Sequence, residues 1–260
     1  MLYFLLIPLI FYIALIPLAY FFAESLIFQP QAPSYSDKHS IIKLKTPNGE
    51  HIAARYFPDL NARYTILFSH GNAEDIGSAE FFLEELNEAG FAVLAYDYRG
   101  YGRSEGRASE KNSYQDIEAA YDYLTGELNV PAERIIIHGR SLGGAVSVDL
   151  AARRKCGGLI VESSFVSAFR VMTRHPVLPF DKFVNLEKIR RVSCPVLIVH
   201  GKNDSLIPVW HGDALFEAAP EPKTALWVEG AGHNDIFFNA KTAYLQAIRD
   251  FSAKLEKNER

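Results

Sequence analysis

Short apolar runs alternate along most of this chain with longer segments in which apolar residues recur at helical spacing. Six runs have the length and composition of buried strands: Tyr64–Ser69, Phe91–Tyr96, the run that ends just before Ser141, Leu159–Glu162, Pro195–His200 and Ala225–Val228. Helical periodicity marks the intervening and final segments: Ala79–Ala89, Tyr114–Leu124, the stretch from Ser141 to Arg154, the region near Ala214, and Tyr244–Leu255. This alternation predicts an α/β fold with a mostly parallel sheet covered by helices on both faces.

Two further strand patterns precede this alternation. Ile41–Lys45 and His51–Phe57 are separated by a turn that contains Asn48 and Gly49. An Asn-Gly pair supplies the positive backbone angles that a tight turn between antiparallel strands requires. We therefore expect a hairpin at one edge of the sheet.

The first 23 residues, Met1 to Ala23, contain no charged side chain and consist mostly of Leu, Ile, Phe and Tyr. Roughly 20 such residues span a bilayer as a helix. This composition predicts a transmembrane anchor at 1–23, an extended linker at 24–38 that contains Pro30 and Pro33, and one globular domain at 39–260. The alternatives are a cleaved signal peptide, for which no basic start or cleavage site is clear, and a buried soluble helix.

The chain is expected to localise to a membrane through this single N-terminal segment, but the side of the membrane stays open. Lys38, Lys43 and Lys45 follow the apolar segment, and no Lys or Arg precedes it. The positive-inside rule then favours a cytosolic domain. The two cysteines, which could form a disulfide in an oxidising compartment, favour the opposite side.

Length and composition narrow the function. The chain has 260 residues, of which 48% are hydrophobic and 22% are charged, so one large core is expected. A net charge of -4 offers no basic surface for nucleic acid. The eight histidines form no paired metal-ligand motif, and no glycine-rich loop matches a nucleotide-binding pattern. We expect neither a metal nor a cofactor.

The stretch around Ser141 carries the strongest chemical signal. It reads as a β-branched strand, then Gly139-Arg140-Ser141-Leu142-Gly143, and then a helix. In a G-x-S-x-G turn the small residues allow the backbone to fold sharply and to lift the serine hydroxyl above the sheet. This context makes Ser141 the candidate nucleophile.

A serine nucleophile needs a base, and the base needs an orienting acid. Asp204 and His233 follow two later strands, which gives the chain order serine, acid, histidine of α/β-hydrolases. His233 is expected to take the proton of Ser141, while Asp204 orients the imidazole. Glu162 and Asp235 are the rival acids, of which Asp235 lies only two residues beyond the histidine.

The oxyanion of an acyl-transfer reaction needs two N–H donors. One comes from the residue after the nucleophile and the other from the loop after the first parallel strand, so the backbones of Leu142 and Asn72 are the candidates. His70 is expected to shape that loop. Asp97 and Arg99, in a turn rich in glycine, are expected to form a structural corner without a chemical role.

Three motifs together resemble those of the serine α/β-hydrolases: Leu67-Phe68-Ser69-His70-Gly71-Asn72-Ala73, Asp97-Tyr98-Arg99-Gly100-Tyr101-Gly102 and Gly139-Arg140-Ser141-Leu142-Gly143-Gly144. More narrowly, the chain is similar to membrane-anchored single-domain members related to protein depalmitoylases and lysophospholipases. The likeness runs from about His39 to the C-terminus. It implies an enzyme that acts on carboxylic esters, thioesters, lysophospholipids or peptides, and the fold does not choose among them.

The region between Glu162 and Pro195, where these hydrolases carry a lid, points to an acyl substrate. It is short and apolar, enough for one or two small helices, and half of its apolar residues are expected to line a slot above Ser141. We therefore expect a hydrolase of carboxylic esters or thioesters that forms an acyl-enzyme on Ser141. The alternatives are a serine peptidase or aminopeptidase of the same fold, and a non-catalytic membrane-tethered scaffold.

Cys156 and Cys194 each precede a strand of the predicted sheet by a few residues. If those strands are neighbours, the thiols lie close enough to bridge, because adjacent strands are about 4.8 Å apart. Two free thiols in a reducing compartment are the alternative.

Overall fold

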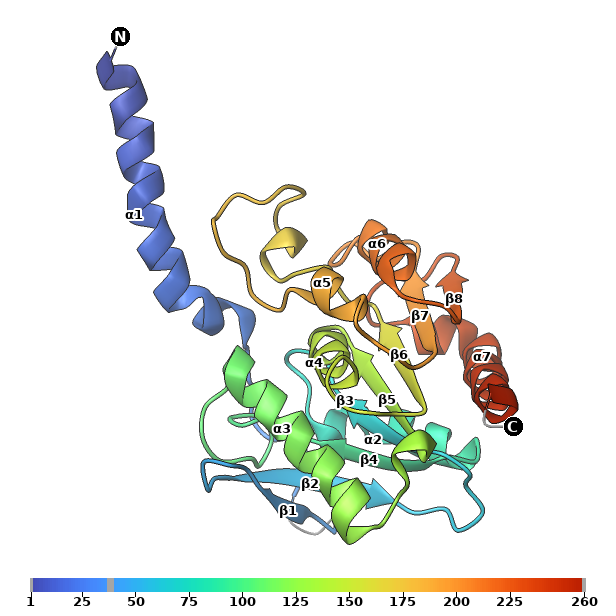
Figure 1. The fold of residues 1–260 in the computed structure, drawn as a ribbon. Coiled ribbons are helices and arrows are strands. Elements are labelled where there is room, and N and C mark those ends of the chain that lie inside the picture. The colour runs from blue at the N-terminus through green and yellow to red at the C-terminus, as the bar shows by residue number, and fades with distance from the viewer. Residues whose placement is uncertain (1, 37–39, 259–260) are drawn as a thin grey trace.

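The computed structural model describes residues 2–36 and 40–258 and contains one eight-stranded sheet (Figure 1). The strands are β1 (Ile42–Lys45), β2 (His51–Phe57), β3 (Thr65–Ser69), β4 (Ala92–Tyr96), β5 (Ile135–Arg140), β6 (Gly158–Glu162), β7 (Val196–Gly201) and β8 (Lys223–Val228). Their order across the sheet is β1-β2-β4-β3-β5-β6-β7-β8. The pairs β1–β2 and β2–β4 are antiparallel and all the others are parallel.

One helix precedes the sheet, and further helices follow most of its strands. The helices are α1 (Leu2–Ile27), α2 (Ile76–Glu88), α3 (Glu110–Asp122), α4 (Leu142–Ala151), α5 (Asn185–Ile189), α6 (Trp210–Ala218) and α7 (Ile236–Asn258). Short π and 3-10 turns complete the set: η1 (Tyr123–Glu127), η2 (Ala132–Arg134) and η3 (Phe169–Val171). This is the α/β-hydrolase arrangement, and it confirms the fold class predicted from the alternating pattern, the edge hairpin included.

Two apolar cores lie on opposite faces of the sheet. Successive side chains of a strand point to opposite faces, so Leu67 of β3 packs in the core beneath α3, α4 and α6, while Ile66 and Phe68 pack beneath α2 and α7. Every residue of β3, β4 and β6 is buried. The continuous apolar runs in the sequence have this physical origin, because a strand covered on both faces has no solvent side.

Helix α1 projects away from the domain (Figure 1). Among the described residues it is the one helix long and apolar enough to cross a membrane, with the qualifying stretch at Ile10–Ile27. Length and composition alone give this result. The helix continues to Ile27, four residues beyond the predicted boundary at Ala23.

The linker predicted for 24–38 begins inside α1, which ends at Ile27, and residues 28–36 form no helix or strand. Phe28 and Tyr35 are buried against the domain, and the Phe28 ring lies 5.9 Å from that of Phe183. Large aromatic side chains are stabilised by burial, so these two residues attach the segment to the domain. The predicted domain start at His39 falls among residues 37–39, which lie outside the described residues.

The segment between β6 and β7 is a short lid, as predicted. It contains only the single turn η3 and the five-residue helix α5. Phe165, Val166 and Phe183 pack into the core on the α4 face. Met172 and Val177, in contrast, are exposed.

The cysteines lie before two paired strands, because β6 and β7 are neighbours and Leu159 pairs with Val196. Both thiols are free, and the Sγ atoms of Cys156 and Cys194 are 3.2 Å apart. The hydrogen bond with Cys194 and burial together raise the pKa of the Cys156 thiol well above its ordinary value. The pair is therefore close enough to bridge but poor in the thiolate that starts the reaction.

We expect glutathione disulfide to oxidise this pair slowly to an intramolecular disulfide, and the two hydrogens and two electrons reduce glutathione disulfide to two molecules of glutathione. The Sγ atoms need to approach to about 2.05 Å, a shift of roughly one ångström. Mass spectrometry without reductant should detect the loss of two hydrogens in the wild type, whereas Cys156→Ser should not form the intramolecular bridge. Persistence of two titratable thiols after prolonged oxidation would contradict this expectation.

Candidate active site

The turn at Ser141 joins β5 to α4 with φ of 55° and ψ of -116°. A β-carbon on Gly139 would come within 2.1 Å of the Gly143 carbonyl oxygen, and one on Gly143 within 2.0 Å of the Ser69 carbonyl oxygen. No side chain fits in such contacts, so the two glycines allow α4 to start directly against the ends of β5 and β3. The Ser141 N–H donates to the Glu162 carbonyl oxygen at 2.8 Å, which fixes the turn to β6.

Three predicted site residues meet at the carboxyl edge of the sheet. The Ser141 Oγ is 3.0 Å from His233 Nε2, and His233 Nδ1 is 2.7 Å from Asp204 Oδ2. They come from the ends of β5, β7 and β8, so residues far apart in the sequence form one hydrogen-bonded line. With Nδ1 donating to the carboxylate, Nε2 is free to accept the serine proton.

The carboxylate of Asp204 is well fixed. Its Oδ1 accepts from the N–H groups of Leu206 at 2.9 Å and Ile207 at 2.7 Å. Burial would raise the pKa of Asp204, but the hydrogen bonds from His200, His233 and Ile207 hold it well below its usual value. Asp204 therefore stays ionised and oriented toward the imidazole throughout the neutral range.

The rival acids have other partners. The Glu162 carboxylate accepts from the Tyr244 hydroxyl at 2.6 Å and lies 3.2 Å from His138 Nε2. Burial would raise the pKa of Glu162, but the hydrogen bond from His138 and the charge of Arg140 hold it below its usual value. Asp235 Oδ1 accepts from the Gly232 N–H at 2.6 Å and closes the turn that carries the histidine.

The candidate oxyanion donors flank Ser141. Leu142 is the first residue of α4, where backbone N–H groups have no partner within the helix. The loop after β3 lies against the serine, since a β-carbon on Gly71 would be 3.6 Å from Ser141 Cβ. Glu74 holds this loop: its Oε2 accepts from the Gly71 N–H at 2.8 Å and from Arg140 Nη2 at 2.8 Å.

The side chain of Asn72 has a role that the sequence did not suggest. Its Nδ2 donates to the carbonyl oxygen of Ile27, the last residue of α1, at 2.6 Å. Its Oδ1 accepts from the Gln29 N–H at 3.0 Å and from the Tyr101 hydroxyl at 2.5 Å. The loop that carries a candidate oxyanion donor is thus bonded to the end of the apolar helix.

The remaining motif residues form a buried corner. His70 Nδ1 is 2.8 Å from the Gly71 carbonyl oxygen, in agreement with its expected shaping role. Asp97 accepts from the Ile76 N–H at 2.8 Å and from the Tyr35 hydroxyl. Arg99 is fully buried and its Nε donates to Asp116 at 2.7 Å. These contacts support a structural interpretation of the corner.

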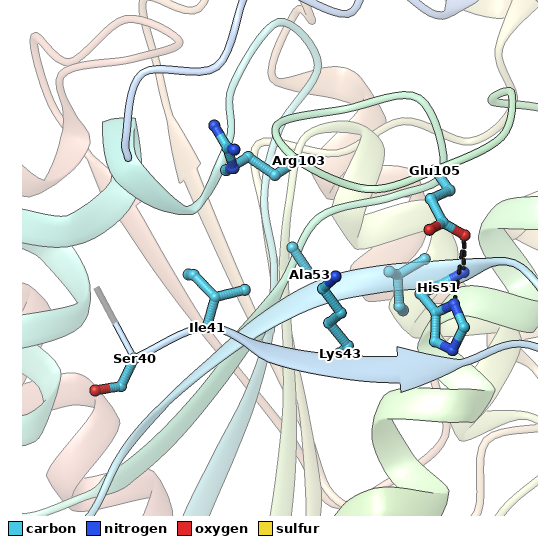
Figure 2. A pocket seen from close by; sticks show the side chains of 8 residues that line it. Ser40, Ile41, Lys43, His51, Ala53, Arg103 and Glu105 are labelled. Carbon is cyan, nitrogen blue, oxygen red and sulfur yellow. Dashed lines mark hydrogen bonds and ion pairs between the residues drawn. The ribbon is translucent and has the colours of Figure 1, made fainter. Parts of the chain in front are cut away.

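A separate cavity of about 490 Å³ lies over the β1–β2 edge (Figure 2), lined by Ser40, Ile41, Lys43, His51, Ile52, Ala53, Arg103 and Glu105. Its lining contains none of Ser141, Asp204 and His233. His51 and Glu105 pair with each other there, with His51 Nδ1 3.4 Å from the carboxylate. The site with reactive geometry is therefore the carboxyl edge of the parallel strands, where sheets of this type place their chemistry.

Comparison with known sequences agrees with this geometry. A family described as serine aminopeptidase, S33, matches residues 61–185. The human α/β hydrolase domain-containing protein 17B is 42% identical over 211 residues, which cover 80% of this chain and 73% of that protein. The Caenorhabditis elegans α/β hydrolase domain-containing protein aho-3 is 44% identical over 194 residues, which cover 74% of this chain but only 58% of that protein.

Solved structures share the fold at lower identity. The Pyrococcus furiosus esterase Pf2001 superposes with a TM-score of 0.73 at 18% identity, covering 87% of this chain and 98% of the esterase. The Est1E protein from Butyrivibrio proteoclasticus, solved with ferulic acid bound, has a TM-score of 0.70 at 19% identity, covering 83% of this chain and 99% of Est1E. With its sheet order, its strand-to-helix turn at Ser141 and this extensive identity, the chain belongs to the α/β-hydrolase superfamily, in the family of the α/β-hydrolase domain-containing proteins 17.

Proposed function

We propose that this protein is a serine hydrolase that cleaves carboxylic esters or thioesters with an acyl chain, through an acyl-enzyme on Ser141. The observation that carries the proposal is the line of hydrogen bonds from Ser141 Oγ to His233 Nε2 at 3.0 Å and from His233 Nδ1 to Asp204 at 2.7 Å. A serine hydroxyl is a weak nucleophile, and this arrangement supplies the base and the acid that activate it.

In the first half of the reaction, Ser141 Oγ attacks the acyl carbonyl carbon while His233 Nε2 takes the hydroxyl proton. The Asp204 carboxylate stabilises the resulting imidazolium. The N–H groups of Leu142 and Asn72 stabilise the oxyanion of the tetrahedral intermediate. His233 then gives its proton to the departing alcohol or thiol, and the acyl group stays on Ser141.

In the second half, water replaces the leaving group. His233 takes a proton from the water as its oxygen attacks the acyl carbonyl carbon. The second tetrahedral intermediate collapses, the carboxylic acid leaves, and His233 returns the proton to Ser141 Oγ. The same two N–H donors serve both intermediates, so no additional group is required.

The choice of an acyl substrate rests on the lid and on α1. The lid has several half-buried apolar side chains, and four of them are the candidates to line an acyl slot: Phe169, Val171, Leu178 and Phe180. In the proposal α1 is a membrane anchor, which would hold this slot near lipids that carry acyl chains. Because these side chains are only half-buried, part of their apolar surface is available to contact a bound acyl chain.

A serine aminopeptidase is the second candidate, because the matching family carries that description. A peptidase of this type would act through the same serine, histidine and aspartate but would bind a charged amino terminus. A non-catalytic scaffold is the third candidate, although a scaffold needs neither the serine nor the base that the chain retains. The experiment that follows distinguishes all three.

We expect Ser141→Ala to reduce turnover at least about a thousandfold, because the nucleophile is lost. The wild type should hydrolyse members of a panel of p-nitrophenyl esters and thioesters from acetyl to palmitoyl, and a fluorophosphonate probe should label it. Ser147→Ala is the matched control, since Ser147 lies on α4 and its hydroxyl has no hydrogen-bond partner among the described residues. This control should keep both activity and labelling.

Each failure has a separate meaning. Cleavage of aminoacyl amides with no reaction on any acyl ester or thioester would establish the peptidase instead. A wild type that reacts with neither substrates nor probe would leave only the scaffold. Activity in Ser141→Ala above about a tenth of the wild type would remove the serine from the mechanism.

Asp204→Asn should lower kcat by about 10³- to 10⁴-fold, because the amide no longer holds the productive tautomer of the imidazole. Glu162→Gln serves as the matched control for loss of a buried carboxylate. It should lower the melting temperature, since Glu162 interacts with Tyr244, His138 and Arg140, but leave kcat within about tenfold. A greater loss of kcat in Glu162→Gln than in Asp204→Asn would mean that the acid is Glu162.

The rate should fall as the pH decreases, because only a neutral imidazole accepts the serine proton. The lowered pKa of Asp204 keeps its carboxylate ionised at all but strongly acidic pH. The fall in rate on the acid side of the pH profile therefore reports protonation of a histidine. Histidines ordinarily titrate between about pH 5 and 8. Measurement of kcat/KM on a soluble ester, with circular dichroism as a check on folding, tests this expectation. A constant kcat/KM down to about pH 4.5 would exclude histidine as the base.

A further inference from the structure

Glu74 is a charged residue of the candidate oxyanion loop that the proposed reaction steps do not use. We define this loop as residues 70–75, between β3 and α2. The Glu74 side chain is only 26% exposed, and its Oε2 accepts from both the Gly71 N–H and Arg140 Nη2 at 2.8 Å. A carboxylate oxygen that accepts two hydrogen bonds has little capacity left for a substrate. These contacts point to a role within the loop itself.

Two successive peptide units of the oxyanion loop are held by side chains. In the first unit, the His70 carbonyl oxygen accepts from the Tyr98 hydroxyl at 2.8 Å, and the Gly71 N–H donates to Glu74. In the second, the Gly71 carbonyl oxygen lies 2.8 Å from His70 Nδ1, which must carry the proton because a carbonyl oxygen only accepts. The fourth polar group of the two units, the Asn72 N–H, has no hydrogen-bond partner in the described part of the chain.

The direction of the Asn72 N–H follows from these contacts. The Gly71–Asn72 peptide unit is planar and trans, so its carbonyl oxygen and its N–H point in opposite directions. This unit can rotate only about the bonds of the Gly71 α-carbon, and glycine has no β-carbon to limit that rotation. The bond from the Gly71 N–H to Glu74 fixes the other side of the same α-carbon. Glu74 therefore restrains the rotation that would turn the Asn72 N–H.

The backbone of Ala73 gives the loop a reason to move if this restraint is lost. Ala73 has φ of 58°, in the left-handed region that residues other than glycine seldom adopt. Such a conformation persists only where the surroundings hold it. Glu74 follows Ala73 directly and reaches back to the Gly71 N–H, so its hydrogen bond closes the turn around the strained residue. Without that bond, relaxation of Ala73 would shift the neighbouring Asn72 N–H.

Arg140 holds Glu74 against the strand that carries the nucleophile. It is the last residue of β5, and its side chain is 14% exposed. Its guanidinium lies 5.7 Å from the ring of Phe68 and 5.4 Å from the ring of Phe82. Burial would lower the pKa of Arg140, but the charges of Glu74 and Glu162 hold it above its ordinary value. Arg140 therefore stays charged, and its attraction for Glu74 is stronger at this largely buried position than in water.

We propose that Glu74, held by Arg140, is a positioning residue for the oxyanion hole and keeps the Asn72 N–H directed at the intermediate formed on Ser141. The proposal rests on the proposed function, because it assigns this N–H to a reaction at Ser141. Glu74 does not touch the substrate and acts through the peptide unit in front of it. A misplacement of about 1 Å can lower a rate on the order of a hundredfold, so a loose loop would be costly in rate.

Glu74→Ala should lower kcat on a soluble p-nitrophenyl ester by about 30- to 100-fold and change KM by less than about threefold, because an oxyanion donor acts on the transition state. A trifluoromethyl ketone with the same acyl chain reads the donor directly. Ser141 Oγ adds to the ketone carbonyl carbon, His233 takes the hydroxyl proton, and the new oxyanion lies where that of the intermediate forms. The inhibition constant of this ketone should rise by the same factor by which kcat/KM falls.

Three further variants separate positioning from stability. Glu74→Gln keeps an oxygen that can accept from the Gly71 N–H, so its kcat should stay within about tenfold of the wild type. Glu85→Ala is the matched control, since Glu85 lies on α2 and pairs with Lys241 at 2.6 Å. It should change neither kcat nor the inhibition constant. Combining Arg140→Met with Glu74→Ala should lower kcat little further than Glu74→Ala alone, because Arg140 acts through Glu74.

Amide hydrogen exchange reads the loop without reference to catalysis. The Gly71 amide should exchange at least about tenfold faster in Glu74→Ala than in the wild type, because its hydrogen bond is lost. Glu85→Ala should leave this exchange rate unchanged. An unchanged rate in Glu74→Ala would show that Glu74 does not hold the loop and would overturn the proposal.

The kinetic outcomes are also separable. Faster exchange in Glu74→Ala with an unchanged kcat and inhibition constant would overturn the positioning role while the proposed function stands. A loss of kcat that only follows the folded fraction, with an unchanged inhibition constant, would mean that Glu74 stabilises the fold and nothing more. A wild type that turns over no ester would overturn the proposed function, and the role of Glu74 with it, before any variant is compared.

Discussion

The backbone of Ser141 is the constraint on which the rest of the site depends. A non-glycine residue with φ of 55° and ψ of -116° is strained by about 1 to 3 kcal/mol, and it persists only where its surroundings hold it. Here the Ser141 N–H bonds to Glu162 of β6, and the Ser164 hydroxyl donates to the Ser141 carbonyl oxygen at 2.8 Å. The sheet and the start of the lid therefore both hold the turn, and these two hydrogen bonds keep the hydroxyl aimed at His233.

The same turn organises the loop across from it. Close packing of Gly143 against Ser69 brings the end of β3 beside the nucleophile. Arg140, directly before Ser141, pairs with Glu74, and Glu74 accepts from the Gly71 N–H. An ion pair in a half-buried position is strengthened relative to one in water. The nucleophile and the candidate oxyanion loop are thus fixed to each other by residues that need not touch a substrate.

The sequence predicted the sheet, its helices and the three residues that meet at its edge, because these depend on local periodicity and on motifs at strand ends. It did not predict the burial of Phe28 and Tyr35, since these residues stand among prolines and polar residues that suggested an extended linker. Those two isolated aromatics were the available signal. The contacts of Asn72 with Ile27 and of Arg140 with Glu74 were not predictable either, because they join segments whose relative position only the folded chain determines.

The contacts of Asn72 join the loop after β3 to the end of α1. Its backbone is a candidate oxyanion donor, whereas its side chain bonds to the last carbonyl of α1 at 2.6 Å and to the following segment at 3.0 Å. A helix end leaves its final carbonyls without partners, and Asn72 satisfies one of them. The end of α1 is therefore held by a residue whose neighbour, Gly71, lies against the proposed nucleophile Ser141. Because the lid also bonds to α1 through Tyr12, the helix is joined by hydrogen bonds both to the lid and to the loop that carries the candidate oxyanion donor.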